Sequence, residues 1–217
     1  LAYNMPHLPL RTADAFRGRS GAGLYADVVE SIDWSVGRIL QALDRQGLSE
    51  NTLIFFASDN GPWKNLPSRM LNGGVKPWHQ GSTALLRGSK RTTYEGGTRV
   101  PAIIRWPNHI PKDQVSAQLA ATPDIYRTLM EIGGAKLPGY QLDGYNLMPW
   151  LTGSESSSPR QQYAYFLYGR LEAMVIGDWK LRLASKNTQL FNLRVDPSER
   201  FNRAKEHPEI VKRIKQR

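Results

Sequence analysis

The sequence of 217 residues contains no cysteine, which excludes disulfide bonds and metal sites built from thiolates. Nor does it contain an apolar run close to the roughly 20 residues that a membrane-spanning helix needs. A charged and then apolar leader is also missing, and Leu1 is not a start methionine. We therefore expect a truncated beginning, so that the missing signal peptide says nothing about the compartment.

What the sequence does contain favours a folded, loop-rich α/β protein. Apolar residues make up 40% of the chain, which is enough to form a core at this length. The 19 glycines and 14 prolines predict many loops between the apolar segments.

The net charge of +10 is concentrated near the carboxyl end, where residues 160–217 hold 13 lysines and arginines against 6 acidic residues. Such a surplus suits a binding module for nucleic acid or a sulfated polysaccharide, although a solvated surface has the same composition. No nucleic-acid-binding motif accompanies the charge, so we expect no nucleic-acid partner.

The first part of the chain predicts a helix, a strand and a long loop. Apolar residues at steps of three and four indicate a helix over residues 22–46. The apolar run at residues 53–57 predicts a buried strand that ends just before Asp59 and Asn60. In a mostly parallel sheet, ligands collect beyond the carboxyl ends of strands, so we expect these two side chains at a crevice. The polar stretch at residues 60–98 predicts a loop of functional length.

The second part predicts one more strand and helix, then a small separate unit. We expect a strand at residues 100–106 and a helix over residues 122–130. A linker-like composition near residues 152–159 places a boundary between residues 155 and 156. Beyond it, short runs spaced like an antiparallel meander occur at residues 163–168, 173–176, 180–183 and 189–193. A last helix is expected from about His207 to the end.

Asp59 and Asn60 are the first candidates for chemistry. They supply a carboxylate oxygen and a carboxamide oxygen side by side, the hard ligands that Ca²⁺ and Mg²⁺ prefer. An Asn-Gly pair also forms tight turns, so a turn without function is the alternative. Because calcium takes six to eight oxygens, the other ligands must come from elsewhere.

A second string, residues 86–101, contains Lys90 followed by Arg-Thr-Thr-Tyr-Glu-Gly-Gly. It is not a phosphate-binding P-loop, because the glycine and lysine spacing is wrong and no strand leads into it. With residues 58–61 before it and Trp106-Pro107 after it, this string resembles the type I sulfatases, the arylsulfatase family of the alkaline-phosphatase-like superfamily. Further matching pieces occur in the family's order at residues 25–33, 143–149, 177–181, 190–193 and 196–199.

The resemblance implies a fold and a domain division. The fold is part of an alkaline-phosphatase-like α/β/α sandwich, followed by a small carboxyl-terminal α+β subdomain with an antiparallel sheet. Residues 1–155 are then the carboxyl-terminal part of the catalytic domain, and residues 156–217 form the subdomain.

The resemblance also implies roles for individual residues. Asp59 and Asn60 match two ligands of the family's divalent cation, usually calcium, and Lys90 matches a lysine that contacts the sulfate. His7 matches a histidine that reaches the sulfate and helps to protonate the leaving oxygen, although an ordinary loop histidine is the alternative. His79 lies in the long loop, where a substrate contact and an exposed loop histidine are equally compatible with the sequence.

Two parts of the family's active site are absent. Its nucleophile is a formylglycine made within a Cys/Ser-x-Pro/Ala-x-Arg motif, which this sequence lacks, and its paired amino-terminal aspartates are missing too. We therefore expect the second half of a sulfatase, without turnover of its own. The resemblance implies a periplasmic, secreted or lysosomal protein.

Several functions stay open at this point. The first is hydrolysis of sulfate monoesters, with sulfated carbohydrates preferred over aryl sulfates as substrates. A phosphate or phosphonate ester hydrolase of the same superfamily is the nearest alternative, since a cation and an Asp-Asn pair suit either oxyanion. A relative that binds sulfated ligands without cleaving them is the third.

Overall fold

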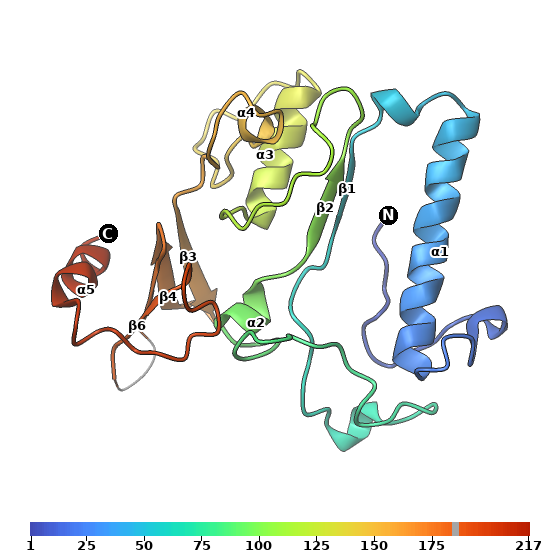
Figure 1. Ribbon diagram of the computed structural model, residues 1–217, viewed down its shortest axis with the longest axis horizontal. Helices are drawn as coiled ribbons and strands as arrows, with labels where there is room; N and C mark the ends of the chain where they lie inside the picture. The colour runs from blue at the N-terminus through green and yellow to red at the C-terminus, as the bar shows by residue number, and fades with distance from the viewer. Residues whose placement is uncertain (184–186) are drawn as a thin grey trace.

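The computed structural model describes residues 1–183 and 187–217. Its central element is a two-stranded sheet of β1 (Ile54–Ala57) and β2 (Ala102–Arg105). In Figure 1 the helix α1 (Leu24–Arg45) lies on one side of this sheet. On the other side lie α3 (Thr122–Ile132) and the short α4 (Met148–Leu151). Short 3-10 turns at Asp14–Phe16, Ser49–Asn51 and Ser68–Met70 connect these elements.

The two expected helices and two expected strands of this part are confirmed, but the expectation that the first strand is buried is wrong, because Phe55, Phe56 and Ala57 of β1 are exposed. Glycines with positive φ stand at both ends of α1, Gly23 at 94° and Gly47 at 65°, which explains where the apolar period starts and stops. Helix α3 has a proline in its first turn, and Asp124 accepts a hydrogen bond from the Ala121 N–H at 2.8 Å.

The pairing of the two strands differs from the expectation. We expected a mostly parallel sheet, but β1 and β2 run antiparallel, with Ile54 opposite Arg105 and Ala57 opposite Ala102. The long loop between them brings the chain back in the opposite direction. The crevice argument from parallel strands is therefore wrong for this pair, and Asp59 lies beyond the end of β1 beside the start of β2.

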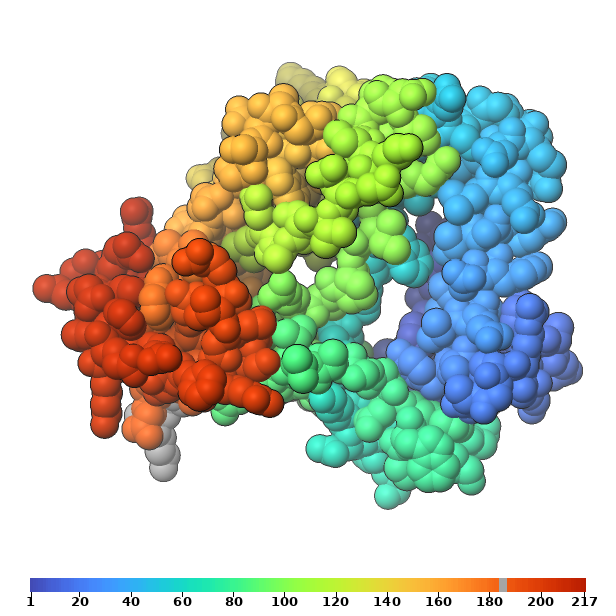
Figure 2. Space-filling model, in the orientation of Figure 1, coloured from blue at the N-terminus to red at the C-terminus, as the bar shows by residue number. Residues whose placement is uncertain are grey.

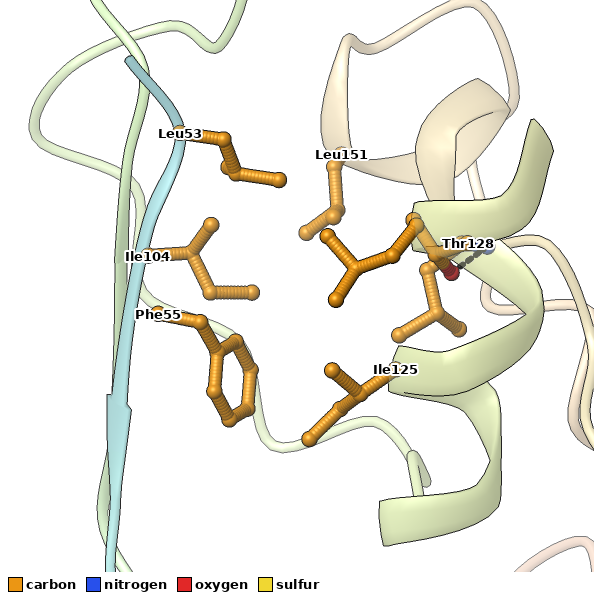
Figure 3. Close-up of a pocket in the computed structure, with 8 residues that line it drawn as sticks. Leu53, Phe55, Ile104, Ile125, Thr128 and Leu151 are labelled. Carbon is orange, nitrogen blue, oxygen red and sulfur yellow. Dashed lines mark hydrogen bonds between the residues drawn. The ribbon is translucent and has the colours of Figure 1, made fainter. Parts of the chain in front are cut away.

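The two faces of this sheet have different surroundings. One face packs on α3 and α4 around a small cavity of about 20 Å³, and Figure 3 shows Leu53, Phe55 and Ile104 pointing across it to Ile125 and Leu151. Because side chains alternate along strands, Phe56 and its register partner Ile103 point to the other face. These two are 38% and 65% exposed, and Figure 2 shows the molecule hollowed between the blue α1 segment and the green strand segments.

The carboxyl-terminal meander is also confirmed. Strands β3 (Gln162–Leu167), β4 (Arg170–Ile176), β5 (Trp179–Arg182) and β6 (Gln189–Asn192) form an antiparallel sheet in that order. Helix α5 (Pro208–Lys215) packs on it through Ile214, which contacts Leu181 and Leu190. The domain boundary at residue 155 stays a prediction.

A last element, α2 (Glu95–Thr98), lies between the strand pair and this sheet (Figure 1). Within the described ranges, no helix combines the length and the apolar character needed to cross a membrane.

Candidate functional site

The structure brings Asp59, Asn60 and Lys90 onto two loops that are hydrogen-bonded to each other. We call residues 58–62 the strand-end loop and residues 87–97 the lysine loop. The Gly61 N–H donates to the Gly97 carbonyl at 3.0 Å, and the Lys90 N–H donates to the Pro62 carbonyl at 2.9 Å. Two backbone bonds therefore fix the base of Lys90 relative to the residues that follow Asp59 and Asn60.

Glycine is required where these loops meet. A Cβ added to Gly61 would overlap the carbonyl oxygen of Gly96, and one added to Gly97 would overlap the carbonyl oxygen of Thr92. Gly61, Gly96 and Gly97 do not have a positive φ. Glycine is therefore needed at these positions because the two backbones approach closely. The Gly-Gly pair of the second string thus serves the contact between the loops.

Asp59 and Asn60, proposed from the sequence to bind a cation, keep oxygens without partners in the described part of the chain. Asp59 is exposed, and its carboxylate makes no hydrogen bond or ion pair within residues 1–183 and 187–217. The Asn60 Nδ2 donates to the Gly61 carbonyl at 2.9 Å, which leaves Oδ1 as the group without a donor among these residues. Two neighbouring hard oxygens fit part of a calcium shell. In the described part of the chain, no three His, Asp or Glu side chains form a metal-binding group.

Lys90 is similar in this respect. Its ammonium group has no hydrogen bond or ion pair with any residue that the structure describes. An ammonium group with three unused donors suits an anionic ligand.

His7 is exposed, and the residue after it anchors its segment in the core. Its Nδ1 donates to the Leu8 carbonyl at 2.7 Å, because a carbonyl can only accept, and so the neutral ring presents an unprotonated Nε2. The adjacent Leu8 is buried in a cluster that includes Val28, Val75 and Trp63. Since Trp63 directly follows the strand-end loop, the same cluster anchors both segments.

His79 is buried rather than exposed. It is 8% exposed, and its Nδ1 accepts a hydrogen bond from the Lys76 N–H at 3.1 Å. Its Nε2 lies 3.0 Å from where a Cβ on Gly23 would stand, next to the start of α1. The alternative of an exposed loop histidine is therefore wrong, and the substrate contact stays a prediction. The neighbouring Trp78 is 68% exposed.

Asp27 lies close to His79 and holds the loop before α1. Its carboxylate accepts hydrogen bonds from the Ser20 hydroxyl at 2.6 Å, the Gly18 N–H at 2.9 Å and the Ser20 N–H at 3.0 Å. These bonds lower the pKa of Asp27 below its usual value, since they favour the charged form.

A buried charged cluster lies behind the lysine loop. The Lys180 ammonium on β5 is 0% exposed and pairs with Glu95 at 2.7 Å and Glu199 at 3.1 Å. It also lies 4.8 Å from the centre of the Tyr165 ring. Burial raises the pKa of Glu199, although Lys180 and the Glu95 N–H act in the opposite direction.

The sheet also holds the two residues before Glu95. Arg182 on β5 donates to the Thr93 hydroxyl at 2.6 Å, and this hydroxyl donates to Glu172 on β4 at 2.9 Å. Arg182 also stacks on the Tyr94 ring, with its Cζ 3.6 Å from the ring centre. Three consecutive residues of the lysine loop are therefore bound by side chains of the carboxyl-terminal sheet.

Sequence reasoning did not assign roles to Lys180, Glu95 or Glu199. All three occur in strings that carried the family resemblance, but a charge in such a string does not reveal burial. The sequence of β5 contained a signal for these ion pairs, because Lys180 and Arg182 lie on one face of the strand and Leu181 on the other. The face with Leu181 packs on α5, and the other face lies against the lysine loop. Charged residues on one face of a strand covered on both sides indicate internal ion pairing.

Comparisons with known proteins agree with the resemblance. Residues 1–135 match a family model described as Sulfatase, and residues 88–217 match one described as N-sulphoglucosamine sulphohydrolase, C-terminal. The chain is 38% identical to human arylsulfatase A, over 85% of this chain and 34% of that protein. It is 32% identical to N-acetylgalactosamine-6-O-sulfatase of Bacteroides thetaiotaomicron, over 96% of this chain and 43% of that protein.

Solved structures give the same result. One from work on glycosaminoglycan metabolism by Bacteroides thetaiotaomicron superimposes with a TM-score of 0.81 at 31% identity, covering 98% of this chain and 47% of that chain. Another, Ps i-CgsB in complex with k-i-k-neocarrahexaose, has a TM-score of 0.79 at 29% identity, covering 99% and 47%. The chain thus spans about a third to just under half of the length of these proteins.

Proposed function

This chain belongs to the sulfatase family and has its alkaline-phosphatase-like fold, and from that premise we propose that it supplies the carboxyl-terminal part of an active site that hydrolyses sulfate monoesters. The observation that carries the proposal is the pair of bonded loops. They carry a carboxylate, a carboxamide oxygen and an ammonium group on two loops joined by backbone hydrogen bonds, and these groups have no partner among residues 1–183 and 187–217.

Asp59 and Asn60 hold a divalent cation in this proposal, with calcium as the preferred ion. Their oxygens have the right chemistry, and the bond from Asn60 Nδ2 to the Gly61 carbonyl sets the direction of Oδ1. When bound, the cation stabilises negative charge on the sulfate oxygens. The remaining ligands come from outside residues 1–217.

Lys90 and His7 act on the sulfate ester. A sulfate monoester carries one negative charge, and cleavage moves charge onto the ester oxygen, so a fixed ammonium stabilises the transition state more than the ground state. The Nε2 of His7 delivers a proton to the leaving oxygen when the ring is protonated. We propose that the loop segment containing His79 contacts the substrate, next to the exposed Trp78.

The catalytic unit is larger than these 217 residues in this proposal. The sequence lacks the Cys/Ser-x-Pro/Ala-x-Arg motif that yields the formylglycine nucleophile of the family. The exposed Phe56 and Ile103 support the same conclusion, because an apolar sheet face of this kind is normally covered. We expect no turnover from the 217-residue chain by itself.

The proposed substrate class is a sulfated carbohydrate. The relative that matches 96% of this chain is named N-acetylgalactosamine-6-O-sulfatase. The structure of Ps i-CgsB was solved in complex with k-i-k-neocarrahexaose. An aryl sulfate is the second substrate to compare, since arylsulfatase A is also similar.

The test uses the full gene product, meaning these residues together with any sequence that precedes Leu1 in the gene. It is assayed with the sulfate ester and the phosphate ester of one phenol, and then with 6-O-sulfated N-acetylgalactosamine. We expect faster hydrolysis of the sulfate ester than of the phosphate ester, and release of sulfate from the sugar. Preference for the phosphate ester would contradict the proposed function.

A further inference from the structure

The two ends of the lysine loop, Arg87 and residues 95–96, come together at what we call its neck. The buried cluster of Lys180, Glu95 and Glu199 lies there. The loop is closed by the Gly96 N–H, which donates to the Arg87 carbonyl at 2.7 Å. Glu199 binds both sides of this neck: its side chain accepts from the Glu95 N–H at 2.7 Å, and its carbonyl accepts from the Arg87 guanidinium at 2.9 Å. Glu199 does this with a φ of 52°, a conformation uncommon for residues other than glycine.

Lys180 joins the two carboxylates of this arrangement. It donates a hydrogen bond to Glu95 and forms an ion pair with Glu199, and all three side chains are at most 6% exposed. Burying charges is costly, and an ion pair of this kind is often no more stabilising than a well-packed apolar set. Stability alone therefore does not account for the cluster, whereas directional pairing fixes the neck in one position.

A fixed neck determines where Lys90 lies relative to Asp59 and Asn60. Next to the neck, the Gly97 carbonyl accepts a hydrogen bond from the Gly61 N–H of the strand-end loop. Near the middle of the lysine loop, the Lys90 N–H donates to the Pro62 carbonyl of the strand-end loop. The glycine contacts leave no room for adjustment at this junction, since a methyl group on Gly61 would already overlap Gly96. A shift of the neck therefore moves both loops.

We propose that Lys180, Glu95 and Glu199 are positioning residues that set the separation of Lys90 from the Asp59–Asn60 pair, so that the carboxyl-terminal sheet controls the rate of sulfate-ester cleavage. This inference rests on the proposed function for its kinetic consequence. Its structural consequence, coupling between β5 and the two loops, does not depend on activity.

Lys180→Met in the full gene product is the main test. The variant removes the cation that links Glu95 to Glu199, so the neck is no longer held in one position. We expect kcat for the sulfate ester to fall about 100-fold, the effect of a misplacement near 1 Å. We expect KM to change by less than about threefold, because the transition state needs the geometry more than ground-state binding does. Glu199→Gln keeps the volume and an acceptor for the Glu95 N–H, so its kcat falls about tenfold.

Arg160→Met is the matched control. Arg160 is 6% exposed and pairs with the fully buried Asp124, its Nε lying 2.7 Å from the carboxylate, but neither residue bonds to the two loops. This variant loses stability to a similar degree while kcat per folded molecule stays at the wild-type value. If Lys180→Met does not fold, Glu199→Gln carries the comparison.

Hydrogen exchange provides a readout that does not need activity. The Gly61 and Lys90 amides report the two bonds between the loops, and both should exchange faster in Lys180→Met and Glu199→Gln but not in Arg160→Met. Wild-type kcat and unchanged exchange in the Lys180 and Glu199 variants would overturn the inference. If the wild type cleaves no sulfate ester, the proposed function fails separately, and unchanged exchange still overturns the positioning role.

Discussion

Charged residues proposed to form the site, on the strand-end and lysine loops, differ from those of the carboxyl-terminal sheet in whether they have partners. In the loops, Asp59 and Lys90 have no protein partners within residues 1–183 and 187–217. In the sheet, Lys180 and Arg182 are buried and paired with carboxylates or hydroxyls. The buried charges of the sheet pair within the fold, whereas the charges proposed to bind a ligand have no partner in the described part of the chain. The contrast separates charges whose loss should cost stability, among which Lys180 also positions the lysine loop, from charges whose loss should cost activity alone.

The largest combined effect on stability and activity is expected where the strand-end loop meets the lysine loop, at Gly61. In Gly61→Ala the new methyl group overlaps the Gly96 carbonyl, and since neither backbone can yield, we expect a loss of about 3 kcal/mol in the free energy of unfolding. Activity should be lost as well, because the strand-end loop separates from the lysine loop. Urea unfolding and an assay on the full gene product measure both.

Gly37→Ala is the control for this change. Gly37 lies inside α1 with nothing within 4 Å of an added Cβ, so alanine should stabilise the protein by about 0.5–1 kcal/mol. Equal effects of the two substitutions would show that close approach at Gly61 is not important.

A smaller effect, confined to the ligand site, is expected for Asp59→Asn. Removing this carboxylate should weaken calcium binding by the full gene product about 100-fold, which isothermal titration after chelator treatment measures. The unfolding free energy without calcium should stay unchanged, since the carboxylate has no partner in the described residues. A destabilised apoprotein with unchanged calcium affinity would place Asp59 among the structural charges.

The smallest effect concerns Asp27, a structural charge in the amino-terminal part. Its pKa is lowered in the folded state, so its contribution to stability is present above the usual Asp pKa and is lost as pH falls through the lower folded value. Asp27→Asn should reduce the melting temperature at neutral pH, and the difference from wild type should shrink in acid.

Local patterns predicted much of the fold. The apolar period of α1 and the spacing of β3 to β6 depend on neighbouring residues, and both were correct. The pairing of β1 with β2 depends on how a long loop returns, which no local pattern contains, and the parallel expectation was wrong.

The candidate site was predictable to a similar extent. Ligand chemistry predicted Asp59 and Asn60, and the family's motif order predicted Lys90. The structure places all three on bonded loops, and their roles stay predictions. The burial of His79 and the pairing of Lys180 with Glu95 were not predictable, because they join residues far apart in the sequence. Such contacts arise only from tertiary packing.

The most direct test of the central contrast measures melting temperature and kcat/KM together for Lys90→Met and Arg160→Met in the full gene product. Lys90→Met should keep the wild-type melting temperature and lose about 100- to 1,000-fold in kcat/KM for a sulfate ester. Arg160→Met should lose about 3–5 kcal/mol in stability and keep its activity per folded molecule. An unstable Lys90 variant with normal kcat/KM, or a stable and inactive Arg160 variant, would contradict the account.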